Sequence, residues 1–433
     1  MRSAADGLDA PALRVLVLTR NYPNNGLPFL GLWAQRLVHA VTRFADAKVV
    51  APVPYVPPLV SRFAPYYARY ADVPAQRWDG PVEVFHPRLL TGPGQSLYAF
   101  EAASYAQAVL PTVHRLRRHF PFDVIHAHFT YPDGVAAALL GRLYGVPVVI
   151  TEHALWLPWM RQQPLVRYQA TWAARACSAH IAVSQAVRDH IGQVTGHPDK
   201  VEVIPNVVDG TVFAPAAGQQ RVPGQILFVG IVRHAKGVDV LLEALRELRQ
   251  QRPAVQLKVV GDPFYRAYQQ EAERLGRLAE KLGVADCVDV VGRKSPAETA
   301  QLMSESQVVV LPSRRESFGT VLIEALACGT PVVATRCGGP EDVVTPAVGR
   351  LVTPDDATAL AAAIAGVLDT PQTYAPDALR RYALAQFGAP VVAHKLGSEY
   401  AAVVGPAVRL DVHTRLAASA DQAKTGANSL AEM

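Results

Sequence analysis

The chain has 433 residues, of which 50% are hydrophobic and 18% are charged, and its formal net charge is +5. This length favours two domains, and the hydrophobic content is that of a core-forming protein, which excludes a disordered chain. The positive charge favours anionic partners such as nucleotide phosphates, nucleic acid or an anionic membrane surface, unless it reflects only a solvated basic face.

Three further observations narrow the class of protein. The four cysteines form no Cys-x-x-Cys pair, which argues against a structural zinc site and favours a reduced, cytosolic chain. Residues 1–12 carry charges at Asp6 and Asp9 and no apolar core, so we expect no signal peptide. No apolar run approaches the roughly 18 residues that cross a bilayer, so we expect any membrane contact to be peripheral.

The first half of the chain opens with the pattern of a parallel α/β sheet. Residues 13–18 are predicted to form a strand, the Asn- and Pro-rich stretch 19–28 a loop, and Gly31 opens an amphipathic helix. The motif Gly-x-Gly-x-x-Gly is absent here, so a nicotinamide dinucleotide site is not supported.

Residues 52–98 are rich in proline and aromatic side chains and are predicted to resist regular structure. Arginines and aromatics alternate in residues 53–70. This stretch either packs on its own domain or meets an amphiphilic acceptor or a membrane interface.

Two later strands of this half end in polar side chains. The strand 122–128 carries His126 and His128 on one face, and the strand 146–151 is followed by Glu152 and His153. Ligands of open parallel sheets bind at the carboxyl ends of the strands. His128 is therefore a functional candidate, with a structural role as the alternative. His126 lies two residues deeper and is expected to be structural, and both roles stay open for His153.

Composition predicts the domain boundaries. We expect an N-terminal Rossmann-like domain over residues 13–208, a linker over 209–224 and a second Rossmann-like domain over 225–388. A helix over 389–410 is expected to return to the N-terminal domain, and residues 411–433 are expected to be a disordered tail. Two such domains facing each other across a cleft can clamp a long ligand and exclude water.

Three loops of the second domain are predicted at the carboxyl edge of its sheet. Lys236 precedes a helix, where a cation beside the helix amino terminus suits a diphosphate, although a single lysine there is more often a surface charge. The second loop is 261–263. The third follows a buried strand, with Glu316 in the loop and Glu324 on the helix after it.

The segment 312–335 resembles the signature of glycosyltransferase family 4, whose members are retaining enzymes of the GT-B fold. It carries two glutamates separated by seven residues, and Cys328-Gly-Thr-Pro-Val-Val-Ala334 follows them. The segments 236–245 and 338–344 are similar to two further segments of that family, as are the strand ends 123–128 and 151–153. The resemblance covers about residues 13–404 and favours the bacterial subgroup that builds exopolysaccharide and teichuronic-type polymers.

The resemblance implies a role for each candidate residue. Glu316 and His128 are the catalytic candidates: Glu316 would contact the transferred sugar, and His128 would contact that sugar or position the acceptor. Lys236 would neutralise the diphosphate leaving group and Glu324 would bind the ribose hydroxyls. The other donor-binding candidates are Ser317, Phe318 and Gly319, through their backbone, and Gly31, as the glycine nearest the phosphates.

The chain departs from the family at one position. Members commonly have an arginine directly after the glycine that matches Gly230, whereas this chain has Ile231 there and Arg233 two places on. Positions two apart in an extended strand share a face. Arg233 is therefore the candidate that replaces the missing arginine.

The activity implied by the resemblance is retaining hexosyl transfer from a nucleotide-diphosphate sugar, with the leaving phosphate helping to deprotonate the acceptor hydroxyl. The acceptor would be a glycan or a polyprenyl-linked glycan in cell-surface polysaccharide synthesis. No cofactor and no metal ion are expected, since the chain contains no Asp-x-Asp. The expected location is the cytoplasm, and the inner face of the cell membrane stays open as a place of peripheral contact.

Two alternatives remain open at this point. A nucleotide-sugar epimerase of the GT-B fold would need no acceptor. A two-lobed sugar-binding protein without turnover would usually be exported. Nucleic-acid binding is disfavoured because the basic residues do not cluster in a known reader motif.

Overall fold

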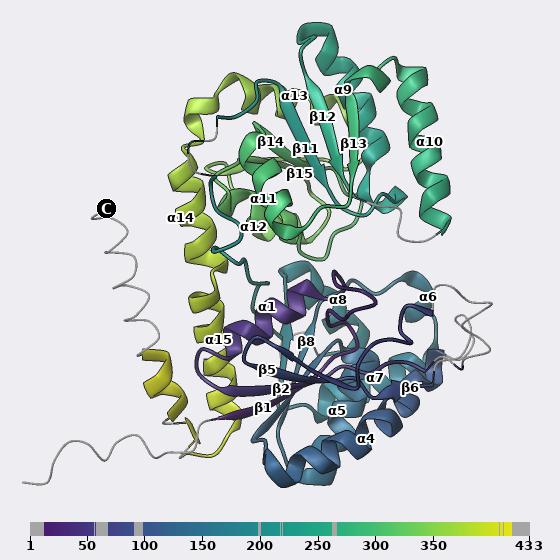
Figure 1. Ribbon diagram of the computed structural model, residues 1–433, viewed down its shortest axis with the longest axis vertical. Helices are drawn as coiled ribbons and strands as arrows, with labels where there is room; N and C mark the ends of the chain where they lie inside the picture. The colour runs from purple at the N-terminus through teal and green to yellow at the C-terminus, as the bar shows by residue number, and fades with distance from the viewer. Residues whose placement is uncertain are drawn as a thin grey trace, which may run out of the picture. The chain divides into compact units, whose positions relative to one another are not determined.

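The computed structural model describes residues 13–55, 57, 68–90, 98–197, 201–216, 218, 220–261, 266–406, 408–409 and 411–417. The chain forms two compact α/β units, and Figure 1 labels many of their helices and strands. The first unit consists of the residues up to Val183, Val187–Pro205 and the residues from Ala389 onward. The second consists of Ser184–Ala186 and Asn206–Gly388.

The first unit is built on an eight-stranded sheet in the order β10-β9-β8-β7-β1-β2-β5-β4, which is parallel except for β4. Its central strands are rich in apolar residues and buried on both faces, as parallel strands covered by helices are. The strands are β1 (Arg14–Leu18), β2 (Asp46–Val50), β4 (Gln76–Asp79), β5 (Val82–Phe85), β7 (Val124–His128), β8 (Val148–Glu152), β9 (Ala179–Ala182) and β10 (Val201–Val203), and β3 (Val53–Pro54) pairs separately with β6 (Arg88–Leu89).

The helices of this unit bury one apolar stripe each. In α1, for example, Leu37, Val38 and Val41 recur at helical spacing and are buried. Helix α1 packs against α15, and α4 packs against α5. The helices are α1 (Leu32–Val41), α4 (Glu101–His119), α5 (Val135–Tyr144), α6 (Pro158–Arg161), α7 (Pro164–Ala176), α8 (Gln185–Thr195) and α15 (Ala389–Val403).

The prediction that residues 52–98 resist regular structure is wrong for much of the described part. Strands β4 and β5 form an antiparallel pair around a turn in which Gly80 has φ +56°. Val82 and Val84 lie two positions apart on one face of β5 and are both fully buried. The apolar residues of this short strand thus follow the period of two that is typical of strands. Residues 56 and 58–67 of the aromatic stretch 53–70 lie outside the described residues.

The second unit contains a fully parallel six-stranded sheet in the order β13-β12-β11-β14-β15-β16. A parallel sheet was expected for this second Rossmann-like domain. The strands are β11 (Gln225–Val229), β12 (Gln256–Val260), β13 (Val288–Gly292), β14 (Val308–Leu311), β15 (Val332–Thr335) and β16 (Gly349–Val352), and the helices are α9 (Val238–Gln251), α10 (Arg266–Leu282), α11 (Pro296–Glu305), α12 (Thr320–Ala327), α13 (Ala357–Asp369) and α14 (Pro376–Phe387).

The start of the second unit differs from the predicted linker 209–224. The backbone N–H of Val208 donates to the Phe387 carbonyl (2.9 Å), and the guanidinium of Arg380 donates to the carbonyls of Gly210 and Phe213 (2.9 Å each). These bonds fix the first residues of the proposed linker on α14. The compact unit therefore begins at Asn206 and not at residue 225.

The carboxyl-terminal tail also differs from its prediction. Residues 411–417 are helical, whereas disorder was expected from residue 411. Val412 and Leu416 are one helical turn apart and both are buried. Leu416 lies against Gly397 of α15, where a Cβ would come within 2.6 Å of it. This apolar pair explains the extra turns, and residues 418–433 lie outside the described residues.

Helix α15 is tied to the centre of the first sheet by one buried hydrogen bond. The Tyr400 hydroxyl lies 2.6 Å from His126 Nδ1, and His126 Nε2 lies 2.7 Å from Thr151 Oγ1. His126 thus has both ring nitrogens satisfied inside the core, which gives it a structural role. None of the helices in the described part of the chain has the length and apolarity that crossing a bilayer requires.

Replacing Tyr400 with Phe is expected to lower the free energy of unfolding by about 1–3 kcal/mol, because a buried ring nitrogen of His126 loses its partner. Urea denaturation of the full chain measures this change. Lys395→Gln, at an exposed position of the same helix, is the control and should change the stability by less than about 0.5 kcal/mol. If the Tyr400→Phe variant is as stable as the wild type, the hydrogen bond between Tyr400 and His126 does not contribute to stability.

Candidate active site

Two loops of the second unit meet at the carboxyl ends of the neighbouring strands β11 and β14. Lys236 Nζ and Glu316 Oε2 form an ion pair across them, and both side chains are 15% exposed. Ser313, which is fully buried, donates from Oγ to the same carboxylate oxygen at 3.4 Å. The structure therefore brings together two residues that the sequence placed eighty positions apart.

A glycine makes this approach possible. Gly237 has φ +66°, and a Cβ at this position would lie 1.9 Å from the Pro312 carbonyl oxygen. Gly237 is also the N-cap of α9, and Gly319, at φ +88°, is the N-cap of α12. Two helices thus begin directly beside the ion pair, and their first N–H groups and dipoles favour an anion there.

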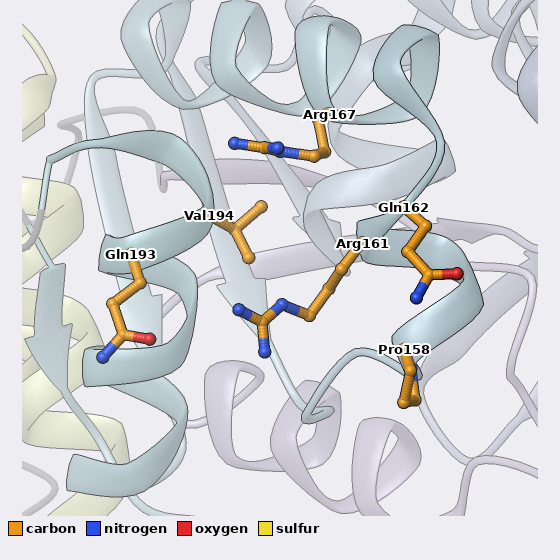
Figure 2. Close-up of a pocket in the computed structure, with 6 residues that line it drawn as sticks. All are labelled: Pro158, Arg161, Gln162, Arg167, Gln193 and Val194. Carbon is orange, nitrogen blue, oxygen red and sulfur yellow. The ribbon is translucent and has the colours of Figure 1, made fainter.

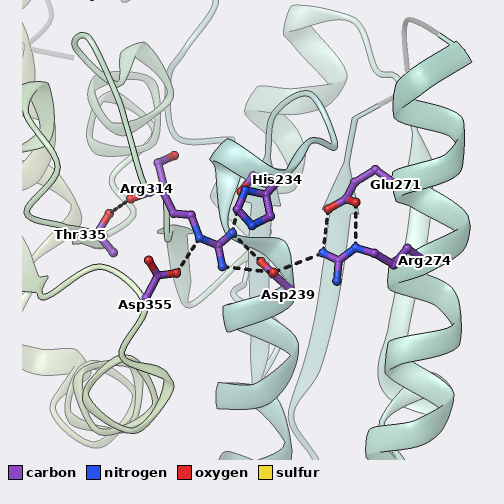
Figure 3. Close-up of polar contacts among 8 residues, drawn as sticks. His234, Asp239, Glu271, Arg274, Arg314, Thr335 and Asp355 are labelled. Carbon is purple, nitrogen blue, oxygen red and sulfur yellow. Dashed lines mark hydrogen bonds and ion pairs between the residues drawn. The ribbon is translucent and has the colours of Figure 1, made fainter. Parts of the chain in front are cut away.

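Arg314 joins the two loops, as Figure 3 shows. Its backbone N–H donates to the Ala235 carbonyl (2.9 Å), and its Nη1 donates to the His234 carbonyl (2.6 Å). The guanidinium also binds Asp239 on α9 (2.9 and 3.1 Å) and Asp355 (2.6 Å). Arg314 was missed from the sequence, where two adjacent arginines precede Glu316 and nothing tells which one turns inward.

Asp239 is the centre of this cluster. Burial raises its pKa, but hydrogen bonds from Arg314 and Arg274 outweigh burial and hold the pKa below its usual value. Arg274 in turn binds Glu271 (2.8 Å) on α10. The carboxylate of Asp239 therefore stays charged at neutral pH and anchors the loop that carries Lys236.

The backbone around Glu316 is fixed by a second close approach. The Gly339 N–H donates to the Glu316 carbonyl (3.0 Å), and a Cβ on Gly339 would lie 2.2 Å from Phe318 Cα. The Phe318 side chain is buried against Phe387, with ring centroids 5.9 Å apart. Only the backbone of Phe318 is therefore available to a ligand.

The remaining donor-binding candidates surround the same loop. Ser317 is partly buried in it, Gly319 ends it, and Glu324 is partly buried on α12. Of the predicted loop 261–263, only Gly261 belongs to the described residues. A Cβ there would lie 1.9 Å from the Gly230 carbonyl oxygen, so β11 and β12 end in close contact.

Arg233 and Ile231 differ clearly in their surroundings. The Ile231 side chain is 43% exposed. Arg233 is partly buried in an extended backbone conformation, and its Nε is buried without a hydrogen-bond partner among the described residues. A buried guanidinium donor without a partner is costly. An anionic ligand at this edge would relieve that cost.

The first unit gathers histidines at the carboxyl ends of β7 and β8. His128 is fully buried, and its Nδ1 lies 2.8 Å from His153 Nε2. The Trp33 ring lies 3.9 Å from the His153 ring and 5.8 Å from the His128 ring, centroid to centroid. The Nε2 of His128 is buried and has no hydrogen-bond partner within the described ranges.

Trp33 and the pairing of His153 with His128 were missed from the sequence. The only available signal was that Trp33 lies two residues after Gly31, in the first turn of α1. Gly31 has φ +75°, and a Cβ there would lie 1.9 Å from the Asn21 carbonyl oxygen. Gly31 thus lets the loop 19–28 fold back on the start of the helix that presents Trp33.

Glu152 holds the surrounding backbone in place. Its carboxylate is fully buried and accepts hydrogen bonds from the backbone N–H groups of Thr130, His153 and Ala154 (3.0–3.1 Å) and from Trp156 Nε1 (3.2 Å). Burial raises the pKa of this carboxyl group. Glu152 therefore positions the loop of His153, and both of its carboxylate oxygens are used in these hydrogen bonds.

Burial keeps these histidines neutral. It lowers the pKa of His126 to about 3 and the pKa of His180, which contacts Thr130, to about 4. Burial, together with the neighbouring His126 and His153, lowers the pKa of His128 well below its usual value. Among the described residues, no three His, Cys, Asp or Glu side chains gather in a way that could hold a metal ion.

The buried histidines make stability depend on pH with a definite sign. Below their unfolded pKa of 6.5 the unfolded chain binds more protons than the folded chain, so the free energy of unfolding falls as pH drops from 7 to 5. His180→Gln is expected to reduce that loss by roughly 2 kcal/mol. Urea denaturation at both pH values measures it, with His413→Gln, at an exposed position, as the control. An equal loss in wild type and His180→Gln would contradict the linkage.

Two family descriptions match the chain: "Glycosyltransferase Family 4" over residues 70–211 and "Glycosyl transferases group 1" over residues 217–386. A D-inositol 3-phosphate glycosyltransferase of Corynebacterium diphtheriae is 31% identical over 340 residues, which are 70% of this chain and 76% of that protein. Its counterpart in Pseudarthrobacter chlorophenolicus is 30% identical over 297 residues, 63% and 69% of the two chains. A glycogen synthase of Mycobacterium tuberculosis is 32% identical over 259 residues, 58% and 61% of the two chains.

Solved structures share the fold. Sucrose-phosphate synthase of Thermosynechococcus elongatus matches with a TM-score of 0.73 at 21% identity, over 90% of this chain and 98% of that one. Anabaena HepE, in complex with UDP and glucose, matches with a TM-score of 0.67 at 22% identity, over 90% and 100%. The relatives named above do not support the expected exopolysaccharide and teichuronic-type subgroup. The chain belongs to the GT-B glycosyltransferases in which a Glycosyltransferase Family 4 domain precedes a group 1 glycosyl transferase domain.

Proposed function

We propose that the chain is a retaining, metal-independent glycosyltransferase that takes a hexosyl group from a nucleotide-diphosphate sugar. The observation that carries this proposal is the ion pair of Lys236 with Glu316 beside the amino termini of α9 and α12. A cation and two helix termini suit a diphosphate, and a carboxylate suits sugar hydroxyls. HepE was solved with UDP and with UDP-glucose, which supports a nucleotide sugar as the donor.

The ion pair is proposed to exchange partners when the donor binds. The Lys236 ammonium and the unsatisfied Arg233 Nε would take the diphosphate oxygens, which frees the Glu316 carboxylate for the hydroxyls of the transferred sugar. Glu324 would accept hydrogen bonds from the ribose hydroxyls. The cations and the helix dipoles then stabilise the negative charge that develops on the departing diphosphate.

The proposed chemistry retains the anomeric configuration. The bond between the anomeric carbon and the diphosphate oxygen breaks, and the acceptor oxygen bonds to that carbon on the same face. The acceptor proton passes to the departing phosphate. The neutral imidazole of His128 would use its buried, unsatisfied Nε2 to hold a hydroxyl of the sugar or of the acceptor.

The acceptor is proposed to be a glycan or a polyprenyl-linked glycan in cell-surface polysaccharide synthesis, at the inner face of the membrane. A specific observation favours a second candidate, a phosphorylated inositol, because the relatives from Corynebacterium diphtheriae and Pseudarthrobacter chlorophenolicus are named D-inositol 3-phosphate glycosyltransferases. Incubation of a nucleotide sugar with each acceptor class and analysis of the products separates them. Epimerisation without any acceptor would favour a nucleotide-sugar epimerase.

Replacing Glu316 with Ala is expected to lower kcat/KM for transfer by at least about 100-fold, because the sugar loses a partner aimed at it in the transition state. Lys236→Ala and Arg233→Ala are each expected to weaken nucleotide-diphosphate binding by about tenfold. Calorimetry and steady-state assays measure these effects, with Glu273→Gln, an exposed position on α10, as the control. Full transfer by Glu316→Ala, or unchanged affinity in both cation variants, would contradict the assignment.

Arg314→Gln is expected to weaken nucleotide-diphosphate binding by about fivefold, although the guanidinium binds only protein groups. The physical reason is that the loop of Lys236 loses its tie to the loop of Glu316. Arg249→Gln, which breaks a surface pair with Asp286, is the matched control. If Arg314→Gln lowers the melting temperature but leaves donor affinity unchanged, Arg314 does not position Lys236.

A further inference from the structure

The turn 129–134, which follows β7, has an unusual backbone beside the histidine site. Phe129 has φ +78° and ψ 137°, a combination that residues with a side chain rarely adopt. Its ring lies 5.4 Å from the Trp33 ring and 5.6 Å from the His153 ring, centroid to centroid. Such strain persists only where the surrounding structure fixes the backbone. The groups that fix this turn therefore also fix the rings around His153.

Two fully buried carboxyl groups hold the turn 129–134. Glu152 accepts a hydrogen bond from the Thr130 N–H, as described above. Asp133 lies near the other end of the turn, and its Oδ1 accepts a hydrogen bond from the backbone N–H of Arg20 (2.8 Å). Arg20 lies two residues after the end of β1. Asp133 thus ties the segment after β1 to the turn after β7.

The segment that is tied at Arg20 leads directly to Trp33. Gly31 lies so close to the Asn21 carbonyl oxygen that a Cβ would come within 1.9 Å of it, so the residues after Arg20 pack on the start of α1. Trp33 lies in the first turn of that helix, and its ring contacts the His153 ring. A shift of the backbone at Arg20 would therefore move Trp33 relative to His153.

The carboxyl group of Asp133 has neighbours from two other segments. Arg20 interacts with it electrostatically, and the guanidinium of Arg20 also binds Glu101 at the start of α4. The fully buried Tyr105 of α4 faces the same carboxyl group, and Tyr98, just before α4, interacts with it electrostatically. Burial raises the pKa of Asp133 to about 7, although Arg20 and Tyr105 act in the opposite direction.

Other elements that pack against the turn contribute further titratable groups. His180 of β9 lies 3.1 Å from Thr130 Oγ1, and burial lowers its pKa to about 4, so it stays neutral between pH 6 and 8. The hydrogen bonds that Glu152 of β8 accepts oppose the rise in pKa that burial causes. Helix α7 also packs on the turn, but its Arg167 extends toward α8 and lines a surface pocket there (Figure 2).

We propose that Asp133 is a positioning residue of the transfer reaction: by tying Arg20 to the turn after β7, it keeps Trp33 in place against the rings of His128 and His153. This role rests on the proposed function, in which His128 holds a hydroxyl of the sugar or of the acceptor. A charged carboxylate accepts stronger hydrogen bonds than a neutral carboxyl group. The tie is therefore strongest when Asp133 is ionised.

Replacing Asp133 with Ala is expected to lower kcat for transfer about tenfold, because Arg20 loses its anchor and the rings lose their alignment. Asp133→Asn keeps an oxygen that can accept from Arg20 but carries no charge. It should therefore match the wild type at pH 6 and be about threefold slower at pH 8. The probes are UDP-glucose and the acceptor class that the wild type uses. Asp189→Asn, at an exposed position of α8, removes the same charge and should match the wild type at both pH values.

Hydrogen–deuterium exchange tests the tie without any substrate. Peptides that cover residues 19–33 should exchange at least about threefold faster in Asp133→Ala than in the wild type at the same pH, whereas peptides from β11 and β14 of the second unit should not change. UDP affinity should stay within about twofold of the wild type, since the proposed contacts of the diphosphate lie in the second unit. Asp133→Asn keeps the test decisive if Asp133→Ala fails to fold.

Several outcomes would overturn the positioning role. One is unchanged exchange in residues 19–33, and another is faster exchange with an unchanged kcat, which would make Asp133 merely structural. A ratio of wild-type kcat to Asp133→Asn kcat that is equal at pH 6 and pH 8 would also contradict it, as would a loss of UDP affinity without a loss of kcat. A wild type that releases no nucleoside diphosphate from any nucleotide sugar would instead contradict the proposed function, and this role with it.

Discussion

The contact between Lys236 and Glu316 requires that the backbones of their two loops approach closely, in addition to the attraction between the two charges. The Lys236 and Glu316 loops can run side by side only because Gly237 lacks a Cβ, which would lie 1.9 Å from the Pro312 carbonyl oxygen. Gly339 in turn lets the loop after β15 pack on the Glu316 loop, since a Cβ there would lie 2.2 Å from Phe318 Cα. Arg314 then fixes the loops to each other through carbonyl groups and Asp239. Charge, helix termini and an unsatisfied arginine gather at one sheet edge as a result. Such an arrangement suits the diphosphate of the proposed donor.

The candidate sites of the two units differ in charge. The second unit gathers Lys236, Arg233 and two helix termini at one sheet edge, an arrangement that suits a strongly anionic ligand. The first unit buries His126, His128 and His180 so deeply that their pKa values fall and they remain neutral. A neutral imidazole can donate or accept a hydrogen bond without attracting phosphate. The histidine site is therefore suited to hydroxyl groups, and the lysine site to phosphates.

Local patterns in the sequence predicted those features of the structure that depend on residues close together in the chain. The parallel strands of the second unit, the loop of Glu316 and the lysine before α9 all follow from apolar runs, glycines and the family resemblance. Contacts between distant segments were not predictable in this way. Nothing local marks Arg314 as the inward arginine, places Trp33 on His153, or shows that Arg380 would hold Gly210 and Phe213. The helical turns at 411–417 were missed because only two buried side chains support them.

Helix α15 has a consequence for the order in which the chain can fold. The second unit uses Asn206–Gly388 almost exclusively, so its sheet can close once those residues have left the ribosome. The first unit begins earlier but still lacks α15, and with it the Tyr400 hydroxyl that satisfies His126 under the central strand. During synthesis, the first unit can therefore close only after the second, because its histidine-lined core waits for α15 to leave the ribosome.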